Sequence, residues 1–164
     1  PIKSSAASDV YKRQVNNISP LGFILGDEGS GAVLGKLLVG DVLKNQLPPA
    51  IKEAFLKQFD LTAPEIIDRV YRQPFPNRFL ASLSPFLAQH LEEPAIRSLV
   101  LNSFIAFLRR NVMQYDYKQY PVHFIGSVAH CYKEILQEAA QTTGIQIGKI
   151  LQSPMEGLIQ YHQQ

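Results

Sequence analysis

Five of the ten glycines in this 164-residue chain lie in one short stretch around an acidic pair, Asp27 and Glu28. The stretch reads Gly22-Phe-Ile-Leu-Gly-Asp-Glu-Gly-Ser-Gly-Ala-Val-Leu-Gly35. Glycine adopts backbone angles that other residues avoid, and it lets a ligand approach the main chain closely. A carboxylate accepts charge-assisted hydrogen bonds from hydroxyl groups, and bonds of this kind are strong. These residue types therefore suit a loop that binds a neutral polyol such as a sugar.

Two other interpretations of the glycine-rich stretch have to be compared with this one. A phosphate loop of the Walker type ends in Gly-Lys followed by Ser or Thr, whereas Gly35-Lys36 is followed by Leu37. The glycine order also differs from that of the dinucleotide-binding fingerprint. The second interpretation is an ordinary helix start near Ser30, because acidic residues in a first turn complement the helix dipole. The residue types leave the helix start open, and the glycine density favours the ligand loop.

A second candidate motif is Val122-His-Phe-Ile-Gly-Ser-Val128. It reads as a short apolar strand that turns at Gly126 and Ser127 into a helix. Ligands of open α/β sheets bind at the carboxyl ends of the strands, where a glycine admits a flat ring and a helix start offers free N–H groups. The alternative is an ordinary strand-to-helix turn with Ser127 as N-cap. The residues alone favour the ordinary turn.

The remaining residues that could take part in catalysis or metal binding form weaker patterns. The four histidines show no metal-ligand spacing, and His123, inside the apolar strand, is predicted to be packed or hydrogen-bonded. Cys131 is the single cysteine, so it excludes an internal disulfide and a cysteine-based metal cluster. We expect it to be a partly buried structural residue. The charged pairs are interpreted as solvated helix-end charges: Glu92-Glu93 and Arg109-Arg110.

Composition narrows the class of protein. An apolar content of 46% is enough for the core of one domain. There is no run of 18 apolar residues that would predict a transmembrane helix, and no secretory signal pattern. One cysteine fits a reducing compartment, so we expect a cytoplasmic protein without a membrane partner. The net charge is only +2, and the absence of a basic stripe with interleaved aromatics argues against nucleic-acid binding.

Residues 1–14 differ from the rest of the chain. They have no initiator methionine and no apolar periodicity, and they carry three basic residues against one acidic residue. We interpret them as non-native sequence, such as translated adapter or vector DNA. The genuine chain then starts near Val15, partway through a larger protein, and residues 15–164 form one domain.

Proline, capping residues and apolar periodicity predict the elements. Thr62 and Glu65 form a capping-box pattern, as do Ser153 and Glu156, with Pro154 at the first helical position. Helices are expected at about 30–43, 49–59, 62–71, 78–90 with an interruption near Pro85, 94–113, 127–144 and 154–162. Extended segments are expected at 18–25, 122–125 and 145–151. Because a helix joins the last two strands, we expect an α/β domain with parallel strands.

The two motifs together resemble those of a known family. Leu21-Gly22-Phe-Ile-Leu-Gly-Asp-Glu-Gly-Ser-Gly31 is similar to the Gly-Asp-Glu-Gly-Ser motif of the N-acetylglucosamine kinase family, which is grouped with the ATPases that activate benzoyl-CoA reductase. The segment 122–128 resembles the adenosine motif of the same kinases. The resemblance covers roughly residues 16–163. Because the two motifs occur in the same order and at a similar spacing in these kinases, we favour an adenosine motif over an ordinary turn at Ser127.

The resemblance implies specific site residues. Asp27 would bind sugar hydroxyls, and the backbone around Leu21 and Gly22 would line the same pocket. Animal enzymes carry tryptophan where this chain has Leu21. Gly126 and Ser127 would contact adenosine. Ala81 would approach the nucleotide too.

The resemblance also implies an architecture and an activity. The chain would be the C-terminal, ribonuclease H-like lobe of a two-lobed sugar kinase, incomplete, helix-rich and with a small sheet. ATP and an amino sugar would be the partners, and Mg²⁺ would be held mainly by the absent lobe, which would also supply the catalytic base. We expect the fragment alone to be inactive. Whether the full-length protein forms a homodimer is left open. The alternatives are an activator ATPase of a reductase or dehydratase, and a helical interaction module without nucleotide.

Overall fold

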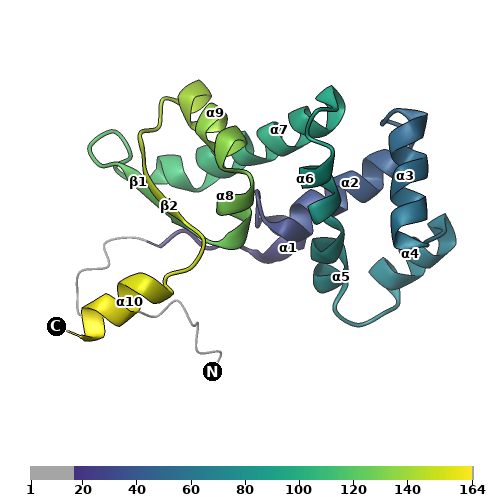
Figure 1. Cartoon of the computed structure of the whole chain (residues 1–164), viewed down its shortest axis with the longest axis horizontal. Coiled ribbons are helices and arrows are strands. Elements are labelled where there is room, and N and C mark those ends of the chain that lie inside the picture. The colour runs from purple at the N-terminus through teal and green to yellow at the C-terminus, as the bar shows by residue number, and fades with distance from the viewer. Residues whose placement is uncertain (1–16, 164) are drawn as a thin grey trace.

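The computed structural model describes residues 17–163, so the predicted non-native segment 1–14 lies outside the described residues. Most of the described chain is helical, and the elements follow one another as Figure 1 shows. The first helices are α1 (Gly22–Leu25), α2 (Gly31–Leu43), α3 (Pro49–Phe59), α4 (Ala63–Tyr71), α5 (Pro76–Leu83) and α6 (Pro85–Gln89). They are followed by α7 (Pro94–Arg110), the 3₁₀ turn η1 (Val112–Gln114), β1 (Val122–Ile125), α8 (Ser127–Cys131), α9 (Lys133–Thr143), β2 (Ile147–Leu151) and α10 (Met155–His162).

The two strands form a parallel sheet, which confirms the predicted strand–helix–strand unit. Phe124 pairs with Ile150 and Ile125 with Leu151, with an irregularity in register near the start of β1. The sheet lies at one end of the molecule and the α3–α4 pair at the other (Figure 1). β1 ends at Ile125 and α8 begins at Ser127, so Gly126 lies between the carboxyl end of the strand and the start of the helix.

The single helix predicted for 127–144 is in fact two helices that meet at Tyr132. The Tyr132 side chain is buried, and its hydroxyl donates a hydrogen bond of 2.9 Å to the carbonyl of Ser84. Burial raises the pKa of the Tyr132 hydroxyl, so it remains a neutral donor. A tertiary anchor of this kind overrides helix propensity, which periodicity alone does not reveal. Gly144 ends α9 in the left-handed conformation, as predicted.

The core is formed mainly by α2, α5, α7 and α9, which pack against one another. The tightest approach is between α2 and α5, where a Cβ atom on Gly35 would lie 1.9 Å from the carbonyl oxygen of Leu80. Glycine is therefore required for these two backbones to touch. The start of α2 is consequently held in a fixed position against α5 and α7, and that start carries the glycine-rich loop.

Most helices begin and end near the residues predicted from the sequence, and capping hydrogen bonds mark two of the helix starts. The Ser30 hydroxyl accepts from the Val33 N–H at 3.2 Å and caps α2. Glu65 accepts from the hydroxyl and the N–H of Thr62, which lowers the pKa of its carboxyl and confirms the predicted capping box.

Two expectations at the ends of the chain are wrong. Residues 18–25 are not all extended, because Gly22–Leu25 form one helical turn with Gly22 at φ 77°. Pro154 is the N-cap of α10 and not its first residue, and the Ser153 hydroxyl accepts from the Met155 N–H. Within residues 17–163, no helix is long and apolar enough to cross a bilayer.

Candidate functional site

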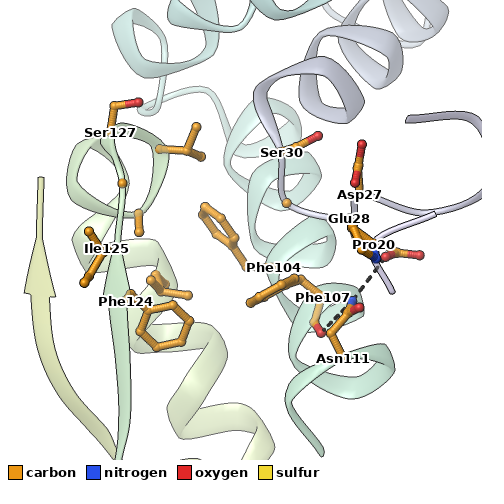
Figure 2. A pocket seen from close by; sticks show the side chains of 15 residues that line it. Pro20, Asp27, Glu28, Ser30, Phe104, Phe107, Asn111, Phe124, Ile125 and Ser127 are labelled. Carbon is orange, nitrogen blue, oxygen red and sulfur yellow. Dashed lines mark hydrogen bonds between the residues drawn. The ribbon is translucent and has the colours of Figure 1, made fainter. Parts of the chain in front are cut away.

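The glycine-rich loop and the end of β1 face each other across one cavity of about 410 Å³. Helix α7 lies between them, and its Phe104 and Phe107 rings separate the two walls (Figure 2). Asp27, Glu28 and Ser30 belong to one wall. The opposite wall includes Phe124, Ile125, Gly126, Ser127 and Val128. The structure therefore brings together the two motifs that lie about 100 residues apart in the sequence.

Asp27 is held by its backbone while its carboxylate stays available. Its N–H donates to the Pro20 carbonyl at 2.8 Å, and its own carbonyl accepts from the Ser30 N–H at 2.9 Å. Its φ of 54° is left-handed, a conformation that costs a residue with a Cβ about 1–2 kcal/mol and that aspartate tolerates better than most. Within residues 17–163, no hydrogen bond or ion pair engages the Asp27 carboxylate. The half-buried carboxylate can thus accept hydrogen bonds from a ligand.

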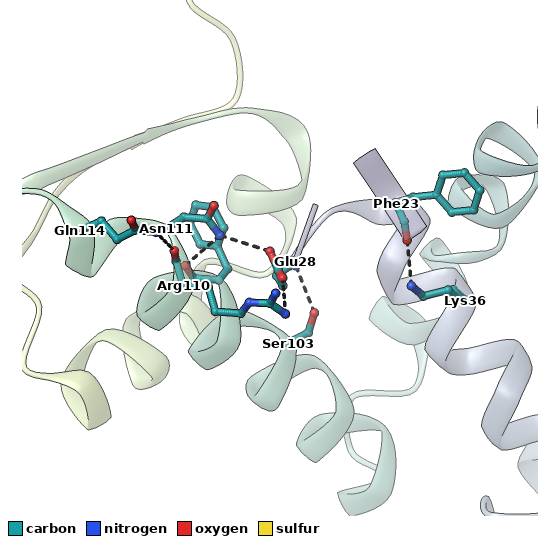
Figure 3. A network of polar contacts seen from close by, with 9 residues as sticks. Phe23, Glu28, Lys36, Ser103, Arg110, Asn111 and Gln114 are labelled. Atoms are coloured by element: carbon teal, nitrogen blue, oxygen red, sulfur yellow. Dashed lines mark hydrogen bonds and ion pairs between the residues drawn. The ribbon is translucent and has the colours of Figure 1, made fainter. Parts of the chain in front are cut away.

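The neighbouring carboxylate, Glu28, has the opposite environment. Its Oε1 lies 2.7 Å from a guanidinium nitrogen of Arg110, and its Oε2 accepts a hydrogen bond of 3.2 Å from the Asn111 side chain. Figure 3 shows Glu28 between these two residues at the end of α7. The Glu28 side chain is only 12% exposed. Arg110 is an exposed charge at the end of α7, as predicted, but it also pairs with a residue 82 positions earlier in the chain, which the sequence did not indicate.

Gly29 anchors the same loop to the middle of α7. Its N–H donates to the Ser103 hydroxyl at 3.1 Å, and the Ser103 side chain is buried. Gly29 has φ 74°, and a Cβ atom there would lie 3.2 Å from the Phe104 ring. The loop thus rests on α7 through a hydrogen bond, an ion pair and an aromatic contact.

The glycine density has a partly structural origin. Gly35 allows the contact between α2 and α5, and a Cβ on Gly31 would lie 3.2 Å from the Ser84 hydroxyl. A Cβ on Gly26 would lie 2.1 Å from the Pro20 carbonyl oxygen, so this glycine lets the loop fold back on itself. These three glycines serve packing. The ligand-loop interpretation therefore depends on Asp27 and not on the number of glycines around it.

The opposite wall is shaped by the backbone of Gly126. Its angles, φ 144° and ψ 158°, fall in a region that essentially only glycine occupies. A Cβ atom there would meet nothing within 4 Å, so the space in front of Gly126 is open. Gly126 is the N-cap of α8 and the exposed Ser127 is its first residue, so the alternative with Ser127 as N-cap is wrong. This wall can accept a flat group close to the main chain.

The other predicted site residues do not line this cavity. Leu21 is 60% exposed and left-handed at φ 62°, and Gly22 follows it as the first residue of α1. Both lie beside Pro20, which does line the cavity. Ala81 is on α5, where it packs behind Gly31. Leu21 and Gly22 therefore lie at the margin of the site. Ala81 lies outside the cavity, next to the first residue of α2.

The remaining candidates are placed elsewhere. The Nδ1 atom of His123 accepts from the Lys149 N–H at 2.9 Å, which confirms that this histidine is hydrogen-bonded. Cys131 is exposed on α8, so its expected partial burial is wrong. Within residues 17–163, no group of three histidine, cysteine or acidic side chains could hold a metal ion.

Sequence reasoning missed the α7 side of the site: Ser103, Phe104, Phe107, Arg110 and Asn111. A signal for Ser103 did exist, because it interrupts the apolar stripe of a helix buried on most sides. A polar residue in such a stripe needs a partner. No local pattern identifies Arg110 or Asn111, since their partner lies in a distant loop.

The chain is similar to a crystal structure of the "putative N-acetylglucosamine kinase" of Porphyromonas gingivalis, with 60% sequence identity and a TM-score of 0.87. The similarity covers 89% of this chain and 52% of that chain, so this chain spans about half the length of the solved structure. No family model and no curated protein matches the sequence. The resemblance to the N-acetylglucosamine kinase family and the helix-rich α/β kinase fold are confirmed.

Proposed function

We propose that this chain is the C-terminal part of an ATP-dependent amino-sugar kinase that phosphorylates N-acetylglucosamine or a close relative. The observation that carries the proposal is the single cavity between an unengaged aspartate and a glycine at the end of a parallel strand. The similarity to a protein described as an N-acetylglucosamine kinase supports the same activity. The single cysteine supports a cytoplasmic enzyme.

The two walls would have different roles. Asp27 would accept hydrogen bonds from sugar hydroxyls, while the Phe104 and Phe107 rings would pack against the apolar face of the sugar. Gly126 and Ser127 would lie against the adenosine of ATP, next to the exposed side chain of Ile125. ATP, when bound, supplies the phosphoryl group.

The groups that complete the chemistry would come from the rest of the enzyme. Phosphoryl transfer depends on positioning and on cations that neutralise the phosphates. As the family resemblance implies, Mg²⁺ and the catalytic base would be held mainly by the other lobe.

The test is an assay of the full-length protein that carries this chain. ADP release is measured against a panel of sugars for the wild type and for Asp27→Asn. Asparagine keeps the size and the tolerance of left-handed angles, so the change removes the charge. A hydrogen bond to a charged group contributes about 1.5–3 kcal/mol, so kcat/KM for the sugar falls by roughly tenfold or more.

Asp60→Asn is the matched control. Asp60 is exposed, is also left-handed at φ 48°, and ends α3 away from the cavity. It is expected to leave sugar-dependent turnover unchanged. ADP release that is indifferent to every sugar and to Asp27 would overturn the kinase and favour the activator ATPase. Failure to bind both ATP and sugars would favour the interaction module.

A further inference from the structure

We propose that Glu28, held by Arg110 and Asn111, is a positioning residue that sets the sugar affinity by fixing the backbone of Asp27. The inference rests on the proposed role of Asp27. It concerns the neighbouring carboxylate, which also lines the cavity but whose two oxygens are engaged by Arg110 and Asn111. The ion pair with Arg110 would thus link the end of α7 to the sugar-binding wall.

The first step is the contrast between two adjacent residues. The Asp27 carboxylate is unengaged in the described structure, whereas the Glu28 carboxylate is almost buried and contacts both an arginine and an amide. Because the two residues share a peptide bond, fixing the Glu28 side chain restricts the angles of Asp27. Those angles are left-handed and strained, so surrounding contacts have to maintain them.

The second step is the position of Arg110 relative to the cavity. Glu28 contributes to two cavities, the candidate site and a second one of about 550 Å³ between α1, α2 and α7. Arg110 lines only the second. It therefore holds Glu28 from the side away from Asp27, and it can act on a sugar only through the loop.

The third step is the asymmetry of the ion pair. Arg110 is 62% exposed and loses little when it is unpaired, but Glu28 is 12% exposed. Without Arg110, a nearly buried carboxylate keeps only the Asn111 hydrogen bond, which does not compensate its desolvation. Glu28 would then turn toward water and move the segment between Asp27 and Gly29.

The experiment uses the full-length protein with Arg110→Ala and Arg110→Lys. Amide hydrogen exchange of residues 26–34 is measured together with the KM values for sugar and ATP. We expect faster exchange in this segment and a rise of about tenfold in the sugar KM for Arg110→Ala, equivalent to about 1.4 kcal/mol. The ATP KM and kcat stay near wild type. Arg110→Lys keeps the charge and recovers most of the loss.

The matched control is Arg97→Ala, because Arg97 also lies on α7 and pairs with a distant carboxylate, Glu138. It is expected to change neither local exchange nor the sugar KM. Unchanged exchange of residues 26–34 in Arg110→Ala would overturn the proposal, whether or not the protein uses sugars. Faster exchange with an unchanged sugar KM would also overturn it. If the wild type turns over no sugar, the proposed function fails, whereas the exchange data still test separately whether Arg110 holds residues 26–34 in place.

Discussion

At the scale of residues, the two carboxylates of the acidic pair have different environments, which fit the binding role proposed for Asp27 and the positioning role proposed for Glu28. Asp27 lines the cavity, and no side chain of residues 17–163 engages its carboxylate, whereas Glu28 contacts Arg110 and Asn111. Both lie in a loop whose N–H and carbonyl groups are bonded to Pro20, Ser30 and Ser103. Such a loop presents the Asp27 carboxylate with little conformational freedom, which lowers the entropy cost of binding a small polar ligand.

The backbone of Gly126 gives the first residue-scale prediction. Gly126→Ala forces a Cβ residue into angles that essentially only glycine adopts, at a cost of about 1–3 kcal/mol. If the segment shifts to relieve this strain, the wall proposed for adenosine moves with it. We expect lower stability in urea unfolding and a raised Kd for ATP, measured by calorimetry on the full-length protein.

Gly144→Ala is the control for that prediction. Gly144 also has a positive φ, at 72°, and open space around its Cα, but it ends α9 outside the cavity lining. Alanine there costs about 1–2 kcal/mol of stability. A loss of ATP affinity in Gly144→Ala as large as that in Gly126→Ala would mean that Gly126 acts only through stability.

Residue chemistry could be predicted where it is local, and not where it depends on distant partners. The sequence singled out Asp27 and Gly126, which line the same cavity, because each lies in a short motif. Glu28 looked equivalent to Asp27, since the two have the same charge and the same neighbours in sequence. Only the fold reveals that Arg110 and Asn111 engage one of them. The exposure of Cys131 was missed as well.

At the scale of elements, α7 supports the whole site. One side of this helix packs in the core with α2 and α9, and residues along its length contact the loop and the cavity. Ser103, Phe104 and Phe107 lie within one or two turns, and Arg110 follows at the C-terminal end. Small shifts of α7 would therefore reach both walls together.

The contact between α2 and α5 gives the element-scale prediction. Gly35→Ala places a methyl group 1.9 Å from the Leu80 carbonyl oxygen, and backbone cannot yield as a flexible side chain does. Overpacking of this kind costs about 1–3 kcal/mol, which urea unfolding would measure. Gly40→Ala in the same helix meets nothing within 4 Å and should instead stabilise by up to about 1 kcal/mol. Equal effects of the two substitutions would contradict close packing as the reason for Gly35.

Most element boundaries followed from chemistry that acts within a few residues. Proline marked the starts of α3 and α7, and capping residues marked those of α2 and α4. The errors arose where tertiary contacts decide. The helical turn α1 depends on a left-handed Leu21 and Gly22, and the division of α8 from α9 depends on the Tyr132 hydrogen bond to Ser84.

At the scale of the whole molecule, large apolar side chains are exposed on the elements that border the site. Leu21, Ile24 and Leu25 around α1 are 60–74% exposed, and Ile125 at the end of β1 is 58% exposed. The chain also spans only about half of the solved structure that it matches. Exposed apolar surface of this kind marks an interaction face, and we expect it to contact the rest of the full-length protein.

This arrangement leads to a prediction about the chain taken by itself. The proposed site supplies one wall for the sugar and one for adenosine, but phosphoryl transfer also needs groups that align the phosphates and neutralise their charge. The chain spans about half of the solved structure that it matches, and we propose that these groups lie in the other half. We therefore expect the purified 164-residue chain to release no ADP with ATP and N-acetylglucosamine, under conditions in which the full-length protein does. A coupled ADP assay would measure both, with circular dichroism to establish that the chain is folded. Sugar-dependent ADP release by the folded chain, abolished in Asp27→Asn, would show that the catalytic groups lie within these residues and would refute a division of the site between two lobes.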